Sequence, residues 1–208
     1  PPRPDVRLRQ RFFARDAIAV ARALLGQERR CGEVRLRVTE TEAYLSDDTA
    51  CHAHGGITPR TEVMFGPPGR AYVYLCYGLH QMLNVVCGAE GEGTAVLVRA
   101  AEPLAGLDVI RARRGGRSGP VLLTGPGKVG AALGVDTSFS HHPLYRAGGL
   151  EAHARPQAED VLVGPRVGSD YASRADREAP RRFALAGTRW VSAPKGTLRA
   201  EAAREVRA

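Results

Sequence analysis

A carboxylate at the end of a predicted strand is the first feature of the sequence that could do chemistry. From residue 33 apolar and polar side chains alternate as far as Thr39, as in a strand with one buried face, and this strand runs on to Tyr44. Residues 45–69, rich in Gly, Pro, Asp and Thr, follow with no sustained period. Glu42 lies near this junction, where a side chain can be held rigidly, face a cleft and have its pKa tuned. Glu42 is therefore a candidate general base.

A structural explanation of the same residue stays open. Glu40 and Glu42 are two positions apart, so both would lie on one face of the strand, and that face could be the one in contact with solvent. For an arbitrary pair of glutamates the exposed position is the more common one.

Three tyrosines lie in the strand predicted over residues 71–77. A period of two puts Tyr72 and Tyr74 on one face and Tyr77 on the other. An aromatic sheet core explains Tyr72 well, whereas Tyr77, beside Gly78, falls at the tip of a predicted hairpin. An exposed aromatic ring on a rigid hairpin in a basic protein could insert between bases.

Two polar residues interrupt otherwise apolar strands. Asn84 lies within residues 81–87, and Arg99 lies near the end of residues 94–100. Buried polar side chains need hydrogen-bond partners, so each residue alone is best explained as structural. On neighbouring strands of one sheet, however, the two could equally line the floor of a polar pocket.

Two other motifs are weak. Cys51, His52 and His54 match no zinc-site spacing, and no second ligand pair follows them. Residues 125–128 (GPGK) resemble a phosphate-binding loop but lack its first glycine and its final hydroxyl residue. We therefore expect neither a bound metal nor nucleotide hydrolysis.

The composition favours a polyanionic partner. Thirty Lys and Arg outnumber twenty-two Asp and Glu, which gives a formal net charge of +8, and DNA, RNA and acidic membranes all fit this charge. Four cysteines are too few for a secreted disulfide framework, and we recognise neither a signal peptide nor a long apolar span. We expect the chain to work in a reducing cytoplasm.

The elements that must position these residues fit one α+β domain over residues 1–208. The sequence predicts helices at 16–26, 104–114 and 125–134 and strands at 33–44, 71–77, 81–87, 94–100 and 182–192. The simplest arrangement is a curved antiparallel β-sheet with a protruding hairpin. We expect an ordered core over about residues 11–192, between a basic N-terminal arm and a charged C-terminal tail.

Read in order, short strings along the chain resemble the alkyladenine (3-methyladenine) DNA glycosylase family. The strings are TETEAY (39–44), CHAHGG (51–56), TPR (58–60), MFGPPG (64–69), YVYLCYG (72–78), NVVCG (84–88), VLVRAAEP (96–103), GPGK (125–128), PRVG (165–168), RRF (181–183) and WVS (190–192). Each string is weak alone, but the ordered set is specific and covers about residues 11–192.

The resemblance implies a bacterial monofunctional glycosylase of base excision repair. Such an enzyme flips damaged purines out of duplex DNA and hydrolyses the N-glycosidic bond, and its substrate class comprises 3-methyladenine, hypoxanthine, 7-methylguanine and ethenoadenine. The implied partner is double-stranded DNA that contains such purines, contacted by a monomer in the cytoplasm and at the nucleoid. No cofactor, metal or membrane is implied.

The resemblance also implies roles for the matching pocket residues. Glu42 would activate water, and Arg99 would help to hold that water and the carboxylate. Tyr44 would stack on one face of the flipped base, and His52 and Tyr74 would pack on the other.

Four further positions would set substrate choice and contact with DNA. Asn84 would crowd the exocyclic amino group of guanine, and Ser169 stands near a pocket position that is often aliphatic in relatives. Tyr77, with Leu79 beside it, would enter the duplex and fill the gap left by the flipped base.

Two other kinds of protein remain as alternatives. A non-catalytic architectural minor-groove binder would use the basic surface and Tyr77 to bend DNA and would not need Glu42. An RNA-binding or transferase domain would use a basic curved sheet with exposed tyrosines to bind single strands or tRNA.

Overall fold

The computed structural model describes residues 6–156 and 160–201, and within them nine strands form one open antiparallel sheet. The strands are β1 (Glu28–Cys31), β2 (Val34–Tyr44), β3 (Ala71–Cys76), β4 (His80–Cys87), β5 (Thr94–Ala105), β6 (Leu150–His153), β7 (Val161–Gly164), β8 (Arg182–Leu185) and β9 (Arg199–Ala200). Their hydrogen-bonded order is β3-β4-β5-β2-β8-β7-β9, with β1 between β2 and β6. The predicted α+β fold with a β3–β4 hairpin is confirmed.

The long strand β2 connects the parts of this sheet. One edge of β2 pairs with β5 over nearly its whole length. The other edge pairs with β1 along its first half and with β8 along its second half. Residues at the C-terminal end of β2 therefore lie where segments far apart in the sequence come together.

The ladder between β2 and β5 has three register shifts, and two of them lie beside the predicted catalytic residues. The register leaves Thr39 of β2 and Arg99 of β5 without a cross-strand partner. Each extra residue is a β-bulge, which bends its strand and reverses the face on which the following side chains lie.

The bulge at Thr39 decides where two carboxylates point. Val38, ahead of the bulge, is buried in the main apolar core. Thr41, after the bulge, donates a hydrogen bond from its hydroxyl to the Ala21 carbonyl of α1 (2.9 Å), so the odd-numbered positions now face that helix. Glu40 and Glu42 consequently leave the apolar core and lie on the opposite face of the sheet.

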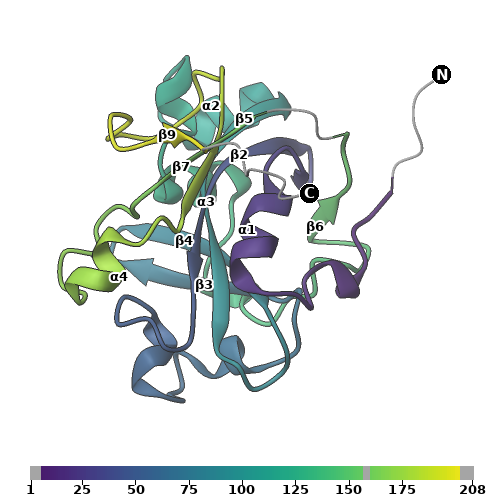
Figure 1. Cartoon of the computed structure of the whole chain (residues 1–208). Coiled ribbons are helices and arrows are strands. Elements are labelled where there is room, and N and C mark those ends of the chain that lie inside the picture. Colours follow the sequence, from purple (N-terminus) through teal and green to yellow (C-terminus); the bar gives the residue numbers. More distant parts are fainter. Residues whose placement is uncertain (1–5, 157–159, 202–208) are drawn as a thin grey trace, which may run out of the picture.

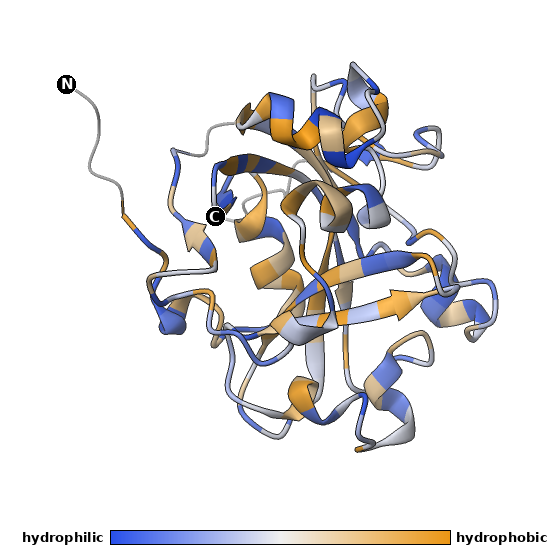
Figure 2. Cartoon of the chain, turned by 180° about the vertical axis from the view of Figure 1, so that it is seen from behind, coloured by the Kyte–Doolittle hydropathy of each residue, from blue (hydrophilic) through white to orange (hydrophobic). Residues whose placement is uncertain are grey.

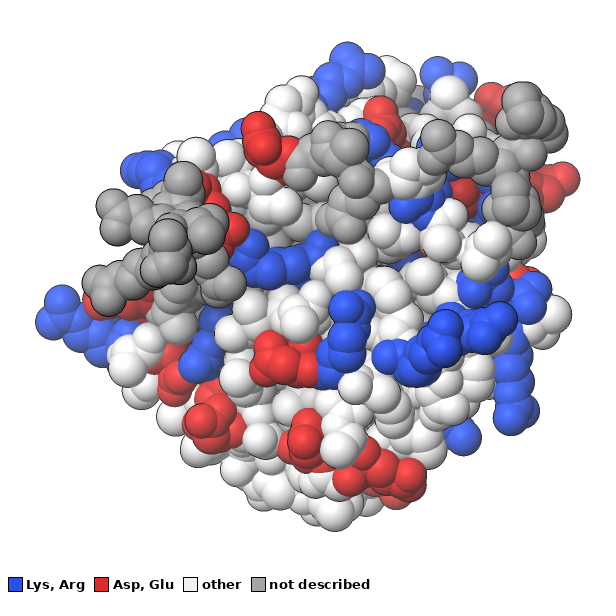
Figure 3. Space-filling model, turned by 45° about the vertical axis from the view of Figure 1, so that its right-hand side comes forward, with Lys and Arg blue, Asp and Glu red and all other residues white. Residues whose placement is uncertain are grey.

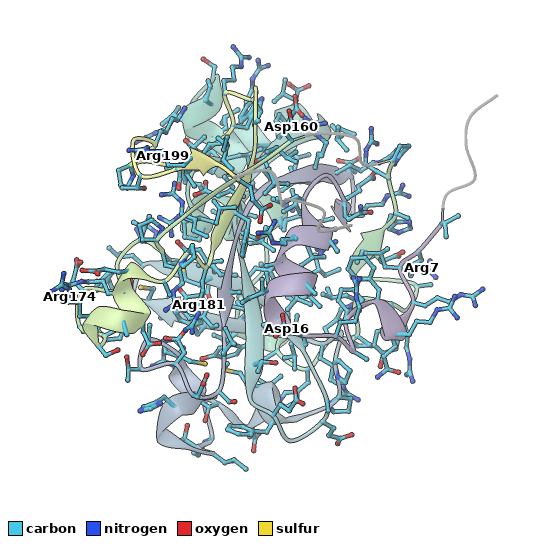
Figure 4. The ribbon with its side chains drawn as sticks, viewed as in Figure 1. Arg7, Asp16, Asp160, Arg174, Arg181 and Arg199 are labelled. Carbon is cyan, nitrogen blue, oxygen red and sulfur yellow. The ribbon has the colours of Figure 1, made fainter. Side chains whose placement is uncertain are left out.

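The main core packs between the sheet and α1 (Ala17–Leu24). The side chain of Asp16 accepts hydrogen bonds from the backbone N–H groups of Ile18 and Ala19, so the helix begins where the sequence predicts. α1 lies beside the long strands near the centre of Figure 1, and Asp16 is labelled at its lower end in Figure 4. Figure 2, in which the molecule is seen from behind, colours this helix mostly in the hydrophobic shades.

The remaining helices are short. They are α2 (Leu107–Arg113), α3 (Pro126–Leu133) and α4 (Arg174–Glu178), and the 3₁₀ helices are η1 (Gln10–Phe12), η2 (His52–Gly55), η3 (Glu62–Phe65), η4 (Pro120–Leu122) and η5 (Thr137–Phe139). α3 begins after Gly125 and ends at Gly134 in the left-handed region, as predicted. The helix predicted at 104–114 starts three residues later because β5 continues to Ala105.

Several elements escaped sequence analysis or end elsewhere. Pairing with neighbouring strands defines β1, β6 and β7, each of which has only four residues and no readable period. The strand predicted at 182–192 ends at Leu185, and Gly187 follows with a φ of 72°. Leu8 of the predicted N-terminal arm is buried and donates its N–H to Ala152 of β6 (2.8 Å). Residues 1–5 and 202–208, the outer parts of the predicted arm and tail, lie outside the described residues.

Candidate active site

A row of paired residues crosses four strands beside a small pocket. Glu42 on β2 pairs with Leu97 on β5. Leu97 pairs in turn with Asn84 on β4, which pairs with Tyr72 on β3. Paired residues of antiparallel strands project from the same face, so this register brings side chains that are distant in the sequence onto one face.

The pocket over this face is small and largely aromatic. It has a volume of about 40 Å³. The lining residues are Tyr44, Ala50, His52, Met64, Tyr72, Tyr74, Asn84, Ala95 and Tyr171. The structure thus brings together four of the five residues assigned to a base pocket from the sequence, and the fifth, Ser169, is not among the lining residues.

Glu42 is fully buried behind Tyr44. Its Oε2 accepts a hydrogen bond from the Tyr44 hydroxyl (3.0 Å), and its Oε1 accepts one from the backbone N–H of Val167 (2.8 Å). Burial raises the pKa of Glu42, although Arg99, 3.4 Å away, and the Val167 N–H oppose this shift. The carboxylate is therefore fixed in place and more basic than one in water.

Arg99 lies between two buried carboxylates. Its Nη1 is 3.4 Å from Glu42 Oε1, and its Nε is 3.2 Å from Glu40 Oε1. The same Nε donates to Ser192 Oγ (2.9 Å). Since Arg99 occupies the bulge on β5, the irregularity in the sheet is what places a cation between the two glutamates.

Glu40 has a complete set of partners of its own. Arg182 donates to its Oε1 (2.6 Å), and the Ser192 N–H donates to its Oε2 (2.7 Å). Glu40 and Glu42 are each 0% exposed, so the alternative that both lie in contact with solvent is wrong. A buried charge needs such partners, and here they come from strands and loops far away in the sequence.

Two arginines hold the segments behind Tyr44. Arg166 donates to both carboxylate oxygens of Asp48, and its guanidinium carbon lies 4.7 Å from the centre of the Tyr44 ring. Arg181 pairs with the same Asp48 (2.8 Å) and with Asp176 of α4 (3.1 Å), and Figure 4 shows it between α4 and the strands. These ion pairs tie the loop after β2 to the loop and helix after β7, and so position Tyr44.

His52, Tyr72 and Tyr74 form one wall of the pocket. The Tyr72 hydroxyl and the His52 Nδ1 are 2.9 Å apart, and the Tyr72 and Tyr74 ring centres are 5.4 Å apart, as expected for residues on the same strand face. The His52 ring meets the Tyr74 ring edge to face at 4.6 Å. Burial and the neighbouring Arg60 lower the pKa of His52 to about 4, so the imidazole is neutral at physiological pH.

Asn84 and Ser169 are both buried, but they differ in their contacts. Both amide hydrogens of Asn84 have backbone partners, the carbonyls of Tyr72 and Met82 (3.1 Å each), which leaves the amide oxygen as its remaining polar atom beside the pocket. The Ser169 hydroxyl has no hydrogen-bond partner among the described residues. Ser169 follows Val167 by two positions and so lies close in the chain to the N–H that binds Glu42.

Tyr77 and Leu79 lie at the tip of the β3–β4 hairpin and not in the pocket. They are 91% and 78% exposed. The Leu79 N–H donates to the Cys76 carbonyl (3.1 Å), and Tyr77 and Gly78 between them have φ of 51° and 66°. The turn is therefore centred on Tyr77 and Gly78, one residue earlier than predicted. Tyrosine rarely adopts a positive φ, and this conformation costs about 1–2 kcal/mol.

Several residues at the site carried no usable signal in the sequence alone. Arg166 and Arg181 belong to the quoted strings PRVG and RRF, but their ion pairs join segments more than a hundred residues apart. Tyr171, which lines the pocket, lies in a segment with no period. Tyr72 was explained as a core residue, and it is both buried and part of the pocket wall.

Three further features of the described residues are their surface charge, their possible metal ligands and the length of their helices. In the face drawn in Figure 3, Lys and Arg side chains form a band at mid-height while Asp and Glu gather below, so positive charge is unevenly distributed. Among the described residues, no group of three or more His, Cys, Asp and Glu could hold a metal ion. No helix in residues 6–156 and 160–201 is long and apolar enough to cross a membrane.

The burial of Glu42 predicts a change in stability. The pKa of Glu42 is higher in the folded than in the unfolded protein. The free energy of unfolding therefore falls as pH rises from the unfolded to the folded pKa, and above the folded pKa the whole cost of burying the charged carboxylate is present. Glu42→Gln keeps the shape and removes this cost, so at pH 7.5 it should raise Tm, by about 2–4 °C for each 1 kcal/mol gained. Thermal unfolding at pH 7.5 and 4.5 should show the gain shrinking at the lower pH. A lower Tm for the variant at pH 7.5 would mean that the charged contacts outweigh the burial cost.

Comparison of the sequence with known proteins shows which family the chain resembles. The sequence matches the family described as "Methylpurine-DNA glycosylase (MPG)" over residues 11–189. A DNA-3-methyladenine glycosylase of Arabidopsis thaliana is 55% identical over 190 residues, which cover 90% of this chain and 75% of that relative.

Bacterial relatives show the same likeness. Proteins of Nitrosococcus oceani and Rhodopseudomonas palustris (strain HaA2), whose names also include 3-methyladenine DNA glycosylase, are 55% and 45% identical over 183 and 187 residues. The matches cover 88% and 90% of this chain and 91% and 90% of the relatives. The resemblance seen in the sequence is thus confirmed, and the chain belongs to the methylpurine-DNA glycosylase family.

Proposed function

We propose that this DNA glycosylase excises 3-methyladenine and related alkylated or deaminated purines, including hypoxanthine, 7-methylguanine and ethenoadenine, with a water molecule activated by Glu42. The observation that carries the proposal is the buried Glu42 carboxylate, held by Arg99, Tyr44 and Val167 next to an aromatic pocket. The enzyme would act as a monomer on duplex DNA in the cytoplasm and at the nucleoid.

The reaction needs a negative charge close to the sugar. When a purine departs with the electrons of the N-glycosidic bond, the sugar becomes cationic, and a fixed carboxylate both stabilises that cation and accepts a proton from the attacking water. The raised pKa of Glu42 suits it to accept a proton. Arg99 offsets only part of the cost of burying the Glu42 charge, because its guanidinium contacts Glu40 as well as Glu42.

The products follow from the available nucleophiles. A bifunctional glycosylase needs an amine to form a Schiff base with the sugar. Lys128 and Lys195 are the only lysines in the chain, and neither lines the pocket. Water is therefore the proposed nucleophile, with the free base and an abasic site as products.

The pocket walls are suited to a planar base. Tyr44 lines one part of the pocket, and His52 and Tyr74 line another, so a flipped purine could stack between aromatic rings. The pocket volume of about 40 Å³ has room for about three water molecules, and we propose that the rings move apart when a base enters. Asn84, whose amide donates to two backbone carbonyls, would stand in a fixed position at the edge of the base and crowd the amino group of guanine.

The hairpin tip is suited to a different task. Tyr77 is almost fully exposed in a strained backbone conformation, and such strain commonly marks functional positions. Its ring, with Leu79 beside it, would enter the duplex and occupy the space of the flipped nucleotide. An architectural binder would need this wedge too, but it would need neither the buried Glu42 nor the pocket, and membership of a glycosylase family favours the enzyme.

The direct test of the proposal uses duplexes that each carry one lesion, followed by alkaline cleavage of abasic sites. Wild type should convert the lesion strand, and Glu42→Gln should bind the same duplex but excise it more than a hundredfold more slowly, a loss of about 3 kcal/mol or more of barrier stabilisation. Single-turnover excision within about tenfold of wild type would show that Glu42 is not the base.

The strained turn gives a separate prediction for Tyr77. Tyr77→Asn removes the ring but suits a positive φ, so the protein should fold at least as stably as wild type. Loss of a stacked ring is worth about 1–3 kcal/mol, so the equilibrium constant for flipping ethenoadenine should fall at least about fivefold, measured by its fluorescence in a Glu42→Gln background. Tyr77→Phe, which keeps the ring, is the matched control. Equal flipped populations in the Asn and Phe variants would refute the wedge.

A further inference from the structure

Arg60 lies on the outer side of the aromatic wall. It is absent from the pocket lining, and it lines instead a neighbouring surface groove of about 410 Å³. Tyr72 and Tyr74 line both the groove and the pocket. The wall therefore has a pocket side, where a base would stack, and a groove side, where Arg60 lies.

The contact between Arg60 and His52 is made over the ring face. One guanidinium nitrogen, Nη2, is 3.1 Å from His52 Nδ1 and 2.9 Å from His52 Nε2. An atom that approached in the ring plane at these two distances would collide with the carbon between the two nitrogens, so Nη2 must lie above the ring. The Arg60 guanidinium carbon is also 5.1 Å from the centre of the Tyr74 ring. One planar cation thus backs two rings of the wall.

No acidic group neutralises Arg60 in the part of the chain that the structure describes. Glu62, two residues further on, faces His141 at 3.7 Å. No carboxylate of the described residues lies within ion-pair distance of the Arg60 guanidinium. Arg60 is exposed, so water screens part of its charge, but no carboxylate in the described part of the chain competes for it with the rings that it covers.

We propose that Arg60 is a positioning residue of the base pocket, whose charge over one face of His52 keeps the imidazole uncharged and able to stack on a cationic purine. This inference rests on the proposed function for its substrate. It concerns a residue that touches neither the base nor the bond that breaks.

The other groups around His52 do not replace this charge. From β3 the imidazole meets the Tyr72 hydroxyl and the Tyr74 ring, and across the pocket lie Tyr44 and Tyr171. None of them is a carboxylate that could hold an imidazolium. Burial and Arg60 both lower the pKa of His52, to about 4, and only the second cause disappears when Arg60 is replaced by a neutral residue.

The charge of the imidazole matters because of the substrate. Purines methylated at N3 or N7 are cationic in DNA, whereas hypoxanthine is neutral. The face of a neutral aromatic ring attracts a cation, but an imidazolium at stacking distance repels it. Without the Arg60 charge the pKa of His52 should rise, although burial, the larger cause of its lowering, still holds it below the ordinary value of about 6.5. Mild acid would then protonate His52 and penalise cationic purines selectively.

The first test needs no substrate. NMR titration of the His52 imidazole, assigned with His52→Gln, should give a low pKa in wild type and in Arg60→Lys, which keeps the charge. In Arg60→Met, which keeps much of the length and loses the charge, the pKa of His52 should rise clearly. The same His52 pKa in Arg60→Met and wild type would overturn the proposal.

The second test uses the ratio of single-turnover excision rates of 7-methylguanine and hypoxanthine at pH 7.5 and 5.5, with spontaneous depurination subtracted. For wild type and Arg60→Lys the ratio should be equal at both pH values. For Arg60→Met the ratio should fall at pH 5.5, by the factor that the protonated fraction of His52 measured by NMR gives. A constant ratio in Arg60→Met would overturn the proposal. If wild type excised neither lesion, the proposed function would be wrong, and the NMR titration would still decide the role of Arg60.

Discussion

The candidate site depends on the pairing between β2 and β5, in which Thr39 and Arg99 each stand without a partner. The first bulge turns Glu40 and Glu42 away from α1 and from the apolar core that packs against this helix. The second places Arg99 between them. A regular ladder would send both carboxylates into apolar packing, where a charge without partners costs several kcal/mol. β-bulges are common beside active sites because they redirect side chains in this way.

The two glutamates, although neighbours on one face, are held differently. Glu40 is surrounded by donors from Arg182 and Ser192 and is a structural anchor for the end of the chain. Glu42 has weaker contact with Arg99 and a single N–H, and its other oxygen meets only the hydroxyl of Tyr44, which lines the pocket. Glu40, which holds the fold together, thus has the stronger hydrogen-bond partners. Glu42, which lies beside the pocket, has fewer and weaker ones.

The sequence was sufficient for the parts of the fold that have a strong local period. Three predictions that depend only on neighbouring residues agree with the structure: the alternation at the start of β2, the helix cap at Asp16 and the glycine at the end of α3. Strands of four residues such as β6 have no such period, because pairing alone defines them. The bulges were not predicted either, because residues 39–42 are all polar and the residues on both sides of Arg99 are all apolar, so no alternation shows the change of register.

The site was predictable in part for a related reason. Ordered strings resembling one family pointed to Glu42, Tyr44 and His52, and the structure brings these residues together, although their roles stay predictions. Arg60 and Arg166 belong to quoted strings as well, yet their contacts arise from chain segments that meet only in the fold. Composition and charge could not separate a repair enzyme from other proteins that bind polyanions.

The central claim is that Glu42 is the base and that Arg99, shared with Glu40, sets its basicity. The most direct measurement is the pH dependence of single-turnover excision of hypoxanthine by wild type and Glu40→Gln, with folding of both checked by circular dichroism. Activity needs ionised Glu42, so the rate for wild type should rise with pH through an acid limb above the ordinary carboxyl value of about 4.3. Glu40→Gln removes a neighbouring negative charge and leaves Arg99 to Glu42, so its limb should move to lower pH. An acid limb at the same or a higher pH in the variant would contradict the account.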